Sequence, residues 1–505
     1  MSATLVANLR STAGRTPDQV ALVRDAQVVT YGALWSMACR FAGGLRAGGF
    51  AVGDRLALGL ENSAEYVAAY YGTLLAGAIV VPLNVAAKAR DFEFWLQHCG
   101  ASWVVCSAEN RELLAATVAT NLNSGLRVVT TAGVAPGATA FGDVTGEFDE
   151  SVAPDPHAPA CILYTSGTTG SPKGVLLSQH NIASNTDAIV EYLRIGAADS
   201  IVCVLPFYYS YGNSVLHTHV KVGAKIVLDD NLVYPHKVIE NLARSRATSF
   251  AGVPSTFSLL LGRGTLADFD LSALRYLTQA GGAMSVATTQ KLRAALPHAE
   301  LFVMYGQTEA SARLTYLPPA DLDRKAGSVG IALPGIALEV RSETGERCEA
   351  MQTGTVWTRG PNVMRGYWNN PGATATTLQD GWLNTGDIGY LDADGFLFLA
   401  GRRSDMIKTG AHRVHPKDVE EVIEELAEVA EVAVVGVNDE LLGQAIKAFV
   451  VAKSPGGVDV MRLKAHCRQR LANYKIPKYV DLVGSLPKTA SGKIRRHELV
   501  ERHTE

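Results

Sequence analysis

Short runs of apolar, often β-branched residues recur along the first 400 positions of the chain, and stretches with helical spacing lie between them. The clearest runs lie at 79–81, 160–164, 201–205, 226–228 and 301–305. Such runs are typical of strands buried on both faces, and their alternation with helices is typical of sheets covered by helices. The pattern therefore predicts a large N-terminal α/β domain with more than one sheet, which we assign to residues 1–400.

The pattern changes near position 401, and residues 406–505 read as a unit of their own. Pro416 stands where the first turn of a helix is expected, and the apolar residues after it fall on one face of that helix. Two apolar strands at 432–437 and 445–451 and a helix near 460–471 follow. The sequence thus predicts a small C-terminal α+β lid domain, with residues 401–405 as the hinge.

Length and charge limit the classes of function. A chain of 505 residues exceeds the roughly 250–300 residues that one core accommodates, so at least two folding units are expected. The net charge of −3, from 46 basic and 49 acidic residues, gives no field that would attract nucleic acid or anionic lipid. The charge balance therefore favours a small-molecule substrate.

Cysteine usage and hydropathy bear on the compartment. The seven cysteines stand singly, without a C-x-x-C pair, as is typical of a reducing environment. No basic and apolar leader is seen at 1–15, and the uncharged stretch 66–87 is interrupted by Gly72, Gly77 and Pro82. We expect a cytoplasmic protein without a membrane span.

The segment 164–174, Tyr-Thr-Ser-Gly-Thr-Thr-Gly-Ser-Pro-Lys-Gly, directly follows a predicted strand. Its glycines let the backbone approach an anion closely, its hydroxyl groups donate hydrogen bonds, and Lys173 supplies positive charge. The spacing differs from G-x-x-x-x-G-K-[ST], because Lys173 is followed by Gly174. The segment predicts a phosphate-binding loop of another kind, with the contacts Thr165, Ser166, Gly167, Thr168, Thr169, Gly170 and Lys173.

This loop resembles the ATP-phosphate loop of the adenylate-forming superfamily, which includes acyl-CoA synthetases, peptide-synthetase adenylation domains, luciferases and related amide ligases. Further motifs follow in the order typical of that superfamily: Gly-Gly-Ala at 281–283, Tyr-Gly-Gln-Thr-Glu at 305–309, Thr-Gly-Asp at 385–387, Gly-Arg at 401–402 and Pro-Lys-Thr-Ala-Ser-Gly-Lys at 487–493. The resemblance implies an ATP- and Mg²⁺-dependent ligase that activates a carboxylic acid as an acyl-adenylate and releases pyrophosphate.

The resemblance also assigns roles within the nucleotide site. Tyr305 is similar to the residue that stacks on adenine, and three small residues of the same site are Gly281, Gly282 and Ala283. Thr308 would meet the α-phosphate, and Glu309, a hard oxygen ligand, would hold Mg²⁺. Taken alone, Thr308 has a structural interpretation as the N-cap of a helix.

Three charged residues complete the site that the resemblance implies. Asp387 would accept hydrogen bonds from the ribose hydroxyl groups, and Arg402 would contact ribose or phosphate. Lys493 would bridge the acid and the α-phosphate, a contact worth roughly 4 kcal/mol at an effective dielectric near 20. The structural alternatives are a turn residue at Asp387 and a solvated basic run around Lys493.

The acyl pocket is expected, by similarity, in segments 206–216, 250–256 and 278–282. Its candidate residues are Phe207, Tyr208, Tyr209, Tyr211, Gly252, Val253 and Pro254. An α-amino acid would need an acidic group near its ammonium, but positions 206–223 contain no Asp or Glu. We therefore expect an uncharged, largely apolar acid. The nearby pair His217 and His219 lacks further ligands and is interpreted as structural.

The resemblance implies that the lid is used twice: after adenylation it would rotate, and another of its faces would form a tunnel for the acceptor. Many members of the superfamily carry Asp or Lys at the pivot and Gly in the tunnel, whereas this chain has Ser404 as the pivot and Ala411 after Gly410. The methyl group narrows a close backbone approach. We expect a thiol acceptor, coenzyme A or a carrier-protein phosphopantetheine.

Two other interpretations stay open. One is an amide ligase similar to coronafacate–amino acid ligases, in which an amine captures the adenylate. The other is a non-catalytic nucleotide-binding protein, which the presence of Lys493, Glu309 and Asp387 disfavours.

Overall fold

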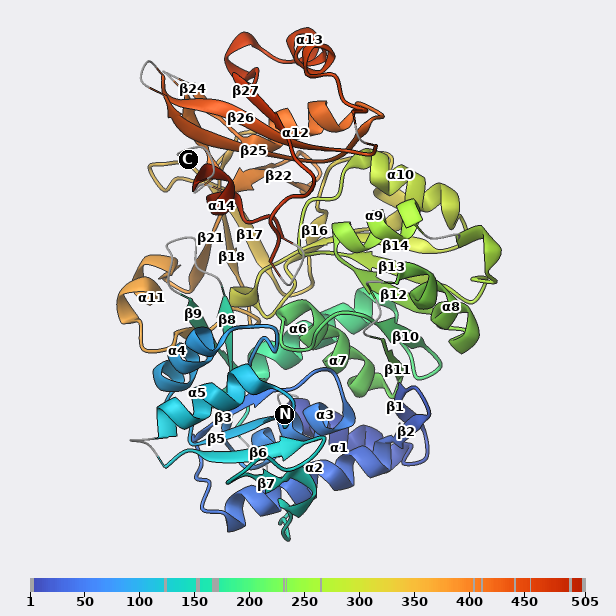
Figure 1. Cartoon of the computed structure of the whole chain (residues 1–505), viewed down its shortest axis with the longest axis vertical. Coiled ribbons are helices and arrows are strands. Elements are labelled where there is room, and N and C mark those ends of the chain that lie inside the picture. Colours follow the sequence, from blue (N-terminus) through green and yellow to red (C-terminus); the bar gives the residue numbers. More distant parts are fainter. Residues whose placement is uncertain are drawn as a thin grey trace.

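Two domains of unequal size make up the chain, and the small C-terminal one is seated on one end of the large N-terminal one (Figure 1). The structure is a computed structural model that describes residues 4–121, 125–150, 155–165, 172–229, 232, 234–263, 266–402, 405–409, 412–439, 442–454, 456–489 and 493–501. Within these ranges the large domain contains three sheets and the small domain one. The predicted fold class, a multi-sheet α/β domain followed by a small α+β domain, is confirmed.

The largest sheet is mainly parallel in its middle. In the described residues its strand order is β16 (Ile331–Ala332), β15 (Thr315–Leu317), β14 (Glu300–Tyr305), β13 (Tyr276–Gln279), β12 (Ser249–Gly252), β10 (Ser200–Cys203), β11 (Lys225–Leu228), β1 (Val20–Arg24) and β2 (Gln27–Thr30). Alternate residues of β10 face opposite cores: Ile201 packs in the central core, and Val202 packs in the core beneath α8 and α9. Burial on both faces explains why the sequence of this strand is apolar throughout.

A second sheet lies beside the first. Its order is β19 (Gly366–Tyr367), β9 (Lys173–Ser178), β8 (Pro159–Thr165), β4 (Ile79–Pro82), β3 (Arg55–Gly59), β5 (Trp103–Ser107), β6 (Arg127–Thr131) and β7 (Thr139–Ala140). A third, smaller sheet contains β17 (Ala337–Arg341), β18 (Gly354–Arg359), β21 (Trp382–Leu391), β20 (Leu378–Gln379) and β22 (Leu397–Arg402). Strands of all three sheets carry residues of the site described below.

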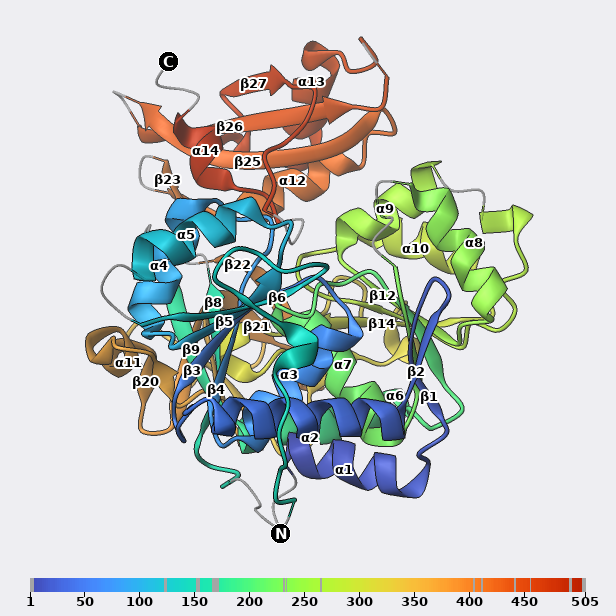
Figure 2. The ribbon, with the colours of Figure 1, turned by 60° about the horizontal axis from the view of Figure 1, so that its bottom comes forward.

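Helices cover the two large sheets. They are α1 (Leu5–Arg15), α2 (Tyr31–Ala47), α3 (Ala64–Leu75), α4 (Ala89–Cys99), α5 (Arg111–Asn121), α6 (Gln179–Leu193), α7 (Ser210–Val222), α8 (Pro235–Ser245), α9 (Pro254–Arg263), α10 (Val286–Ala295) and α11 (Pro371–Thr377). Figure 2 shows α1, α2 and α3 gathered at the end of the molecule away from the small domain. The hydroxyl of Tyr31 in α2 donates to the carbonyls of His219 and Ala224, which ties this layer to α7.

The uncharged stretch 66–87 forms a helix and a strand, as predicted. Ser63 caps α3 by accepting from the Tyr66 amide, and the helix stops before Gly77, whose φ of +73° suits glycine. The chain then enters β4, all of which is buried. Among the described residues, no helix is both long and apolar enough to cross a membrane.

The small domain has the elements that its sequence predicted. Its sheet contains β24 (His412–Val414), β23 (Ile407–Thr409), β26 (Gly443–Ala452), β25 (Val429–Asp439) and β27 (Tyr479–Leu482), and its helices are α12 (Pro416–Glu424), α13 (Val460–Arg470) and α14 (Arg496–Glu501). Pro416 begins α12, and Val419 and Ile423 lie on the buried face of this helix. β22 still pairs with β21 of the large domain, whereas β23 pairs within the small domain.

Candidate active site

Asp387 lies where two sheets of the large domain meet. The Tyr305 hydroxyl, at the end of β14, donates to Asp387 Oδ2 at 2.6 Å, and Arg402 Nε lies 3.2 Å from Oδ1. Strand pairing sets the second contact, because Asp387 of β21 is directly opposite Arg402 of β22. The structure thus brings together three residues that the sequence assigned to one nucleotide site.

Burial and charge act against each other in this cluster. Burial raises the pKa of the Asp387 carboxyl, while Arg402 and the Tyr305 hydroxyl lower it in part. The Asp387 charge in turn raises the pKa of Arg402, and burial raises the pKa of Tyr305 well above its ordinary value. A buried carboxylate held this way is a strong acceptor for hydroxyl groups.

Glu309 is positioned by a residue that the sequence analysis missed. Tyr367 of β19 donates its hydroxyl to Glu309 Oε1 at 2.9 Å, and Lys173 Nζ lies 5.0 Å from the centroid of the same ring. β19 pairs with β9, the strand that begins at Lys173, so Tyr367 lies between Lys173 and Glu309. No motif in the sequence pointed to Tyr367, because its two partners are distant in the chain.

Thr308 lies at the start of a short 3₁₀ helix and touches the beginning of α7. Its hydroxyl donates to Ser210 Oγ at 3.3 Å. Ser210 was not singled out from the sequence either. The contact places Thr308, the residue expected to bind the α-phosphate, beside the segment 206–216 that is expected to bind the acyl group.

Lys493 of the small domain interacts electrostatically with Asp387 and Glu309 of the large domain and with Arg402 at the predicted hinge. Two contacts with Thr489 hold its backbone: the Thr489 amide donates to the Lys493 carbonyl at 2.7 Å, and the Lys493 amide donates to Thr489 Oγ1 at 3.0 Å. Its side chain reaches solvent, yet surrounding protein partly desolvates it. This desolvation, followed by the charge of Arg402, lowers the pKa of Lys493, and Asp387 and Glu309 raise it in part.

The aromatic candidates for the acyl pocket differ in their surroundings. Phe207 is fully buried and packs against Tyr66. Its contact with an acyl group stays a prediction. Tyr208 and Tyr209 contact each other edge to face, and the Tyr211 hydroxyl donates to the Thr278 carbonyl at 2.9 Å. Tyr211 thereby joins α7 to β13.

Two glycines keep the nucleotide and acyl segments close together. A Cβ at Gly281, where φ is +87°, would lie 3.1 Å from Val253, and one at Gly282 would lie 3.4 Å from Pro254. Gly252, which ends β12, directly precedes Val253 and Pro254. The 252–254 and 281–283 segments are therefore in van der Waals contact.

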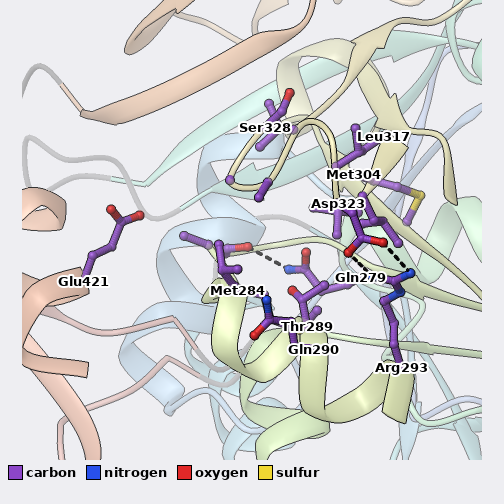
Figure 3. Close-up of a pocket in the computed structure, with 18 of the residues that line it drawn as sticks. Gln279, Met284, Thr289, Gln290, Arg293, Met304, Leu317, Asp323, Ser328 and Glu421 are labelled. Carbon is purple, nitrogen blue, oxygen red and sulfur yellow. Dashed lines mark hydrogen bonds and ion pairs between the residues drawn. The ribbon is translucent and has the colours of Figure 1, made fainter. Parts of the chain in front are cut away.

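A pocket of about 100 Å³ lies between the domains beside these segments (Figure 3). Gln279, Gly282, Ala283 and Met284 line it from the large domain, and Glu421 of α12 faces it from the small domain. Gln279 Nε2 donates to the Gly282 carbonyl at 2.7 Å and so holds the turn. Both the predicted nucleotide segment and the lid contribute to this space.

Several predicted residues lie outside the described ranges: Ser166, Gly167, Thr168, Thr169, Gly170, Ser404, Gly410 and Ala411. Thr165 and Lys173, on either side of the phosphate loop, are paired across β8 and β9. The roles of all these residues stay predictions.

The two histidines of α7 are buried and have protein partners. The ring of His217 bonds to the Tyr71 hydroxyl at 2.8 Å, and His219 Nδ1 lies 2.9 Å from the Val215 carbonyl. Burial lowers the pKa of His217 to about 3 and that of His219 to about 4. Within the described part of the chain, no three His, Cys, Asp or Glu side chains are grouped as metal ligands. Glu309, one of whose oxygens takes the Tyr367 hydrogen bond, suits a hard cation that substrate oxygens also hold.

Comparison with known proteins decides the family. Residues 9–368 match the profile of the AMP-binding enzyme family, and residues 418–493 match that of the AMP-binding enzyme C-terminal domain. The chain belongs to the AMP-binding enzymes. This AMP-binding enzyme has the two-domain arrangement that its sequence motifs implied.

Relatives of known name are similar over nearly their whole length. A long-chain-fatty-acid–CoA ligase of Bacillus subtilis is 32% identical, with 99% of this chain and 95% of that protein covered. A feruloyl-CoA synthase of Amycolatopsis is also 32% identical, with 96% of each covered. Among solved structures, ATP-bound MatB from Rhodopseudomonas palustris has a TM-score of 0.91 at 30% identity, covering 100% of this chain and 99% of that one. The anthranilate CoA ligase AuaEII, in complex with anthranoyl-AMP, has a TM-score of 0.90 at 26% identity, covering 99% and 97%.

Proposed function

We propose that this AMP-binding enzyme is an AMP-forming acyl-CoA synthetase, which activates a largely apolar carboxylic acid with ATP and transfers the acyl group to the thiol of coenzyme A. The observation that carries the proposal is that Lys493 of the small domain lies close enough to Asp387, Glu309 and Arg402 to interact with their charges. The CoA ligases among the relatives and the ATP- and acyl-AMP-bound structures of similar proteins support it. ATP, Mg²⁺ and coenzyme A are the corresponding co-substrates and cofactor.

In the first step, a carboxylate oxygen attacks the α-phosphorus while the bond to the pyrophosphate oxygen breaks. Asp387 holds the ribose, and Thr308 donates to the α-phosphate. Lys493 stabilises the negative charge shared by the two reacting groups. Glu309 would hold Mg²⁺, which would supply positive charge against the phosphate oxygens.

In the second step, the thiolate sulfur attacks the acyl carbon and AMP leaves, while the thiol proton passes to solvent. We propose that the lid turns about residues 401–405, with Ser404 as the pivot, between a large domain of residues 1–400 and a lid of residues 406–505. Gly410 and Ala411 then line the acceptor route. The scattered cysteines, all seven of them free, favour a cytoplasmic site of action.

Ala411 favours a second candidate, an amide ligase, because a methyl group narrows the path for a pantetheine arm. In that case an amine such as an amino acid captures the acyl-adenylate. A carrier-protein phosphopantetheine offers the same thiol chemistry as coenzyme A.

The test is incubation of the enzyme with ATP, Mg²⁺ and a broad library of organic acids, with labelled pyrophosphate exchange as the first measurement. Coenzyme A or a mixture of amino acids is then added, and products are identified by mass. We expect acid-dependent exchange and an acyl-CoA. An amide product would identify the second candidate, and absence of exchange across the library would favour a non-catalytic nucleotide-binding protein.

A further inference from the structure

A small, largely apolar cavity with a few polar side chains in its wall lies between α6, α7 and the strands β10 and β13. Its volume is about 20 Å³, roughly the room that one or two water-sized groups need. Three polar side chains in its lining come from separate segments: His219, Tyr276 and Arg313. All three are buried, and among the described residues His219 Nε2 and Arg313 Nε have no hydrogen-bond partner, whereas the Tyr276 hydroxyl interacts with Ser249. Buried polar groups are nearly always hydrogen-bonded, and the described chain supplies no partner for these two nitrogens.

Arg313 is the strongest of these groups because it carries a charge. Its side chain is 3% exposed, and its guanidinium carbon lies 4.5 Å from the centroid of the Tyr211 ring. Its two terminal nitrogens lie 3.4 Å from the Ala312 carbonyl and 3.5 Å from Ser214 Oγ, at the long limit of hydrogen bonding. The guanidinium group also interacts with the neutral hydroxyl of Tyr192.

Other buried or half-buried guanidinium groups of the large domain have anionic partners. Arg341 pairs with Glu339 at 2.8 Å, and Arg275 pairs with Asp199 at 2.9 Å. No carboxylate in the described part of the chain contacts Arg313. Because a buried cation without an anionic or strong acceptor is costly, the arrangement of Arg313 fits a ligand that supplies one.

The position of the cavity relates it to the acyl site. Ser210, in the first turn of α7, touches Thr308, and Ser214, which touches Arg313, lies four residues further along the helix. Four residues correspond to a rise of about 6 Å. Tyr211, stacked on Arg313, also bonds to Thr278 of β13. The cavity thus lies about one helical turn along α7 from the residue that touches Thr308, on the helix that carries part of the expected acyl segment.

We propose that the acid carries an oxygen hydrogen-bond acceptor at the end remote from its reacting carboxyl group, and that Arg313 is the specificity-determining residue that binds it. This inference rests on the proposed function and deepens it. The largely apolar body expected from segment 206–223 is kept, and the polar end is met by a residue from another part of the chain. A hydroxyl group and a carboxylate share the required chemistry.

The experiment uses matched sets of straight-chain, cyclic and aromatic acids, in which the remote end bears a methyl, a hydroxyl or a carboxylate group. Pyrophosphate exchange gives kcat/KM for each acid. We expect kcat/KM to be at least tenfold higher for an oxygen-bearing acid than for its methyl counterpart. Comparison of the hydroxyl acid with the carboxylate acid then shows which of the two groups is preferred. Equal or better use of the methyl member in every active set would overturn the inference while leaving the proposed function intact. No exchange with any acid would contradict both.

Variants connect the preference to Arg313. Arg313→Met should keep the fold, since apolar replacement of a buried charge is often neutral, and should reduce the preference about tenfold or reverse it. Tyr276→Phe removes a second polar group from the cavity wall and should reduce the preference several-fold, which gives an independent measurement if the first variant is unstable. Tyr66→Phe is the control, because this hydroxyl is also buried but does not line the cavity. A wild-type preference in both Arg313→Met and Tyr276→Phe would refute the assignment.

Discussion

Asp387 is the buried side chain of the site whose carboxyl group interacts with several charged and polar neighbours. It contacts a phenol and a guanidinium group, and its burial raises the pKa of the carboxyl. Arg402 and Lys493 act in the opposite direction and favour the ionised form. The cluster therefore holds a carboxylate ready to accept hydroxyl groups at the edge of two sheets.

We predict that Asp387→Asn weakens ATP use while leaving the fold intact. The amide keeps the shape but loses the charge, and hydrogen bonds to charged groups are worth roughly 1.5–3 kcal/mol. The KM for ATP in pyrophosphate exchange should rise by one to two orders of magnitude. Asp394→Asn, at an exposed ion pair with Arg324, should leave this KM unchanged. An unaltered KM for ATP in Asp387→Asn would remove this residue from the nucleotide site.

The buried histidines give a pH prediction. Their folded-state pKa values, about 3 for His217 and about 4 for His219, lie below the ordinary value near 6.5. The unfolded chain therefore binds more protons below pH 6.5, and stability falls as pH falls from about 6.5 towards 4. Each histidine contributes a loss of about 1.4 kcal/mol per pH unit in that window.

The measurement is the thermal midpoint between pH 7.5 and 4.5. His217→Phe removes one of the two titrating groups, so its midpoint should fall less steeply with acid, even if its midpoint at pH 7.5 is lower through loss of the Tyr71 contact. His236→Phe, at an exposed position, should keep the wild-type slope. A wild-type slope in His217→Phe would mean that His217 is already protonated in the folded state.

The sequence could predict the site only where residues share a local motif. Tyr305, Thr308 and Glu309 stand within five positions of one another, and their grouping is visible without a structure. Tyr367 reaches Glu309 across 58 positions, and Arg313 reaches Ser214 across 99. Such contacts depend on how sheets and helices pack, so no local pattern identifies them.

Among the elements, the turn from β14 into the 3₁₀ helix positions three residues of the site: Tyr305, Thr308 and Glu309. Gly306 follows Tyr305 there, and a Cβ at this position would lie 2.0 Å from the Ala312 carbonyl oxygen. The turn thus fixes the nucleotide residues on one side and Arg313 on the other. No residue with a Cβ fits at position 306 unless the backbone moves.

We predict that Gly306→Ala lowers both stability and activity. Overpacking typically costs about 1–3 kcal/mol, and here the obstacle is backbone rather than a flexible side chain. The thermal midpoint should drop, and pyrophosphate exchange should fall at least tenfold. Gly14→Ala is the control: it lies within α1 with open space around it, and it should be neutral or slightly stabilising. An equal response of the two variants would contradict the tight approach at Gly306.

The elements themselves were largely predictable. The strands β4, β10, β11 and β14 and the helix α12 form where apolar runs and helical spacing indicated them. Short edge strands were not predicted, and β19 is an example: it has two residues and exists because β9 offers it a partner. Strand order was also out of reach, since β1 lies beside β11, about 200 positions away, through packing rather than local pattern.

At the scale of the whole molecule, Lys493 is the lid residue that interacts with the charges of the nucleotide site. It comes from the small domain, but its charge interacts with Asp387 and Glu309 of the large domain and with Arg402 at the hinge. Nearby in the lid, Lys488 bonds to Glu431 at 2.7 Å. The proposed function requires Lys493 for only one of two chemical steps.

We predict that Lys493→Ala separates the two half-reactions. During adenylation the carboxylate and the α-phosphate are both negative, so loss of the ammonium group should slow pyrophosphate exchange by a factor on the order of a hundred or more. During transfer the acyl-AMP already exists and carries a good leaving group, so conversion of supplied acyl-AMP with the acceptor should persist near the wild-type rate. Lys464→Ala, on α13 of the same domain, removes a lysine that bonds only to the Lys478 carbonyl and should leave both rates unchanged. Equal losses in both assays for Lys493→Ala would refute the assignment, because they would mean that Lys493 supports the fold or that the lid does not move between the steps.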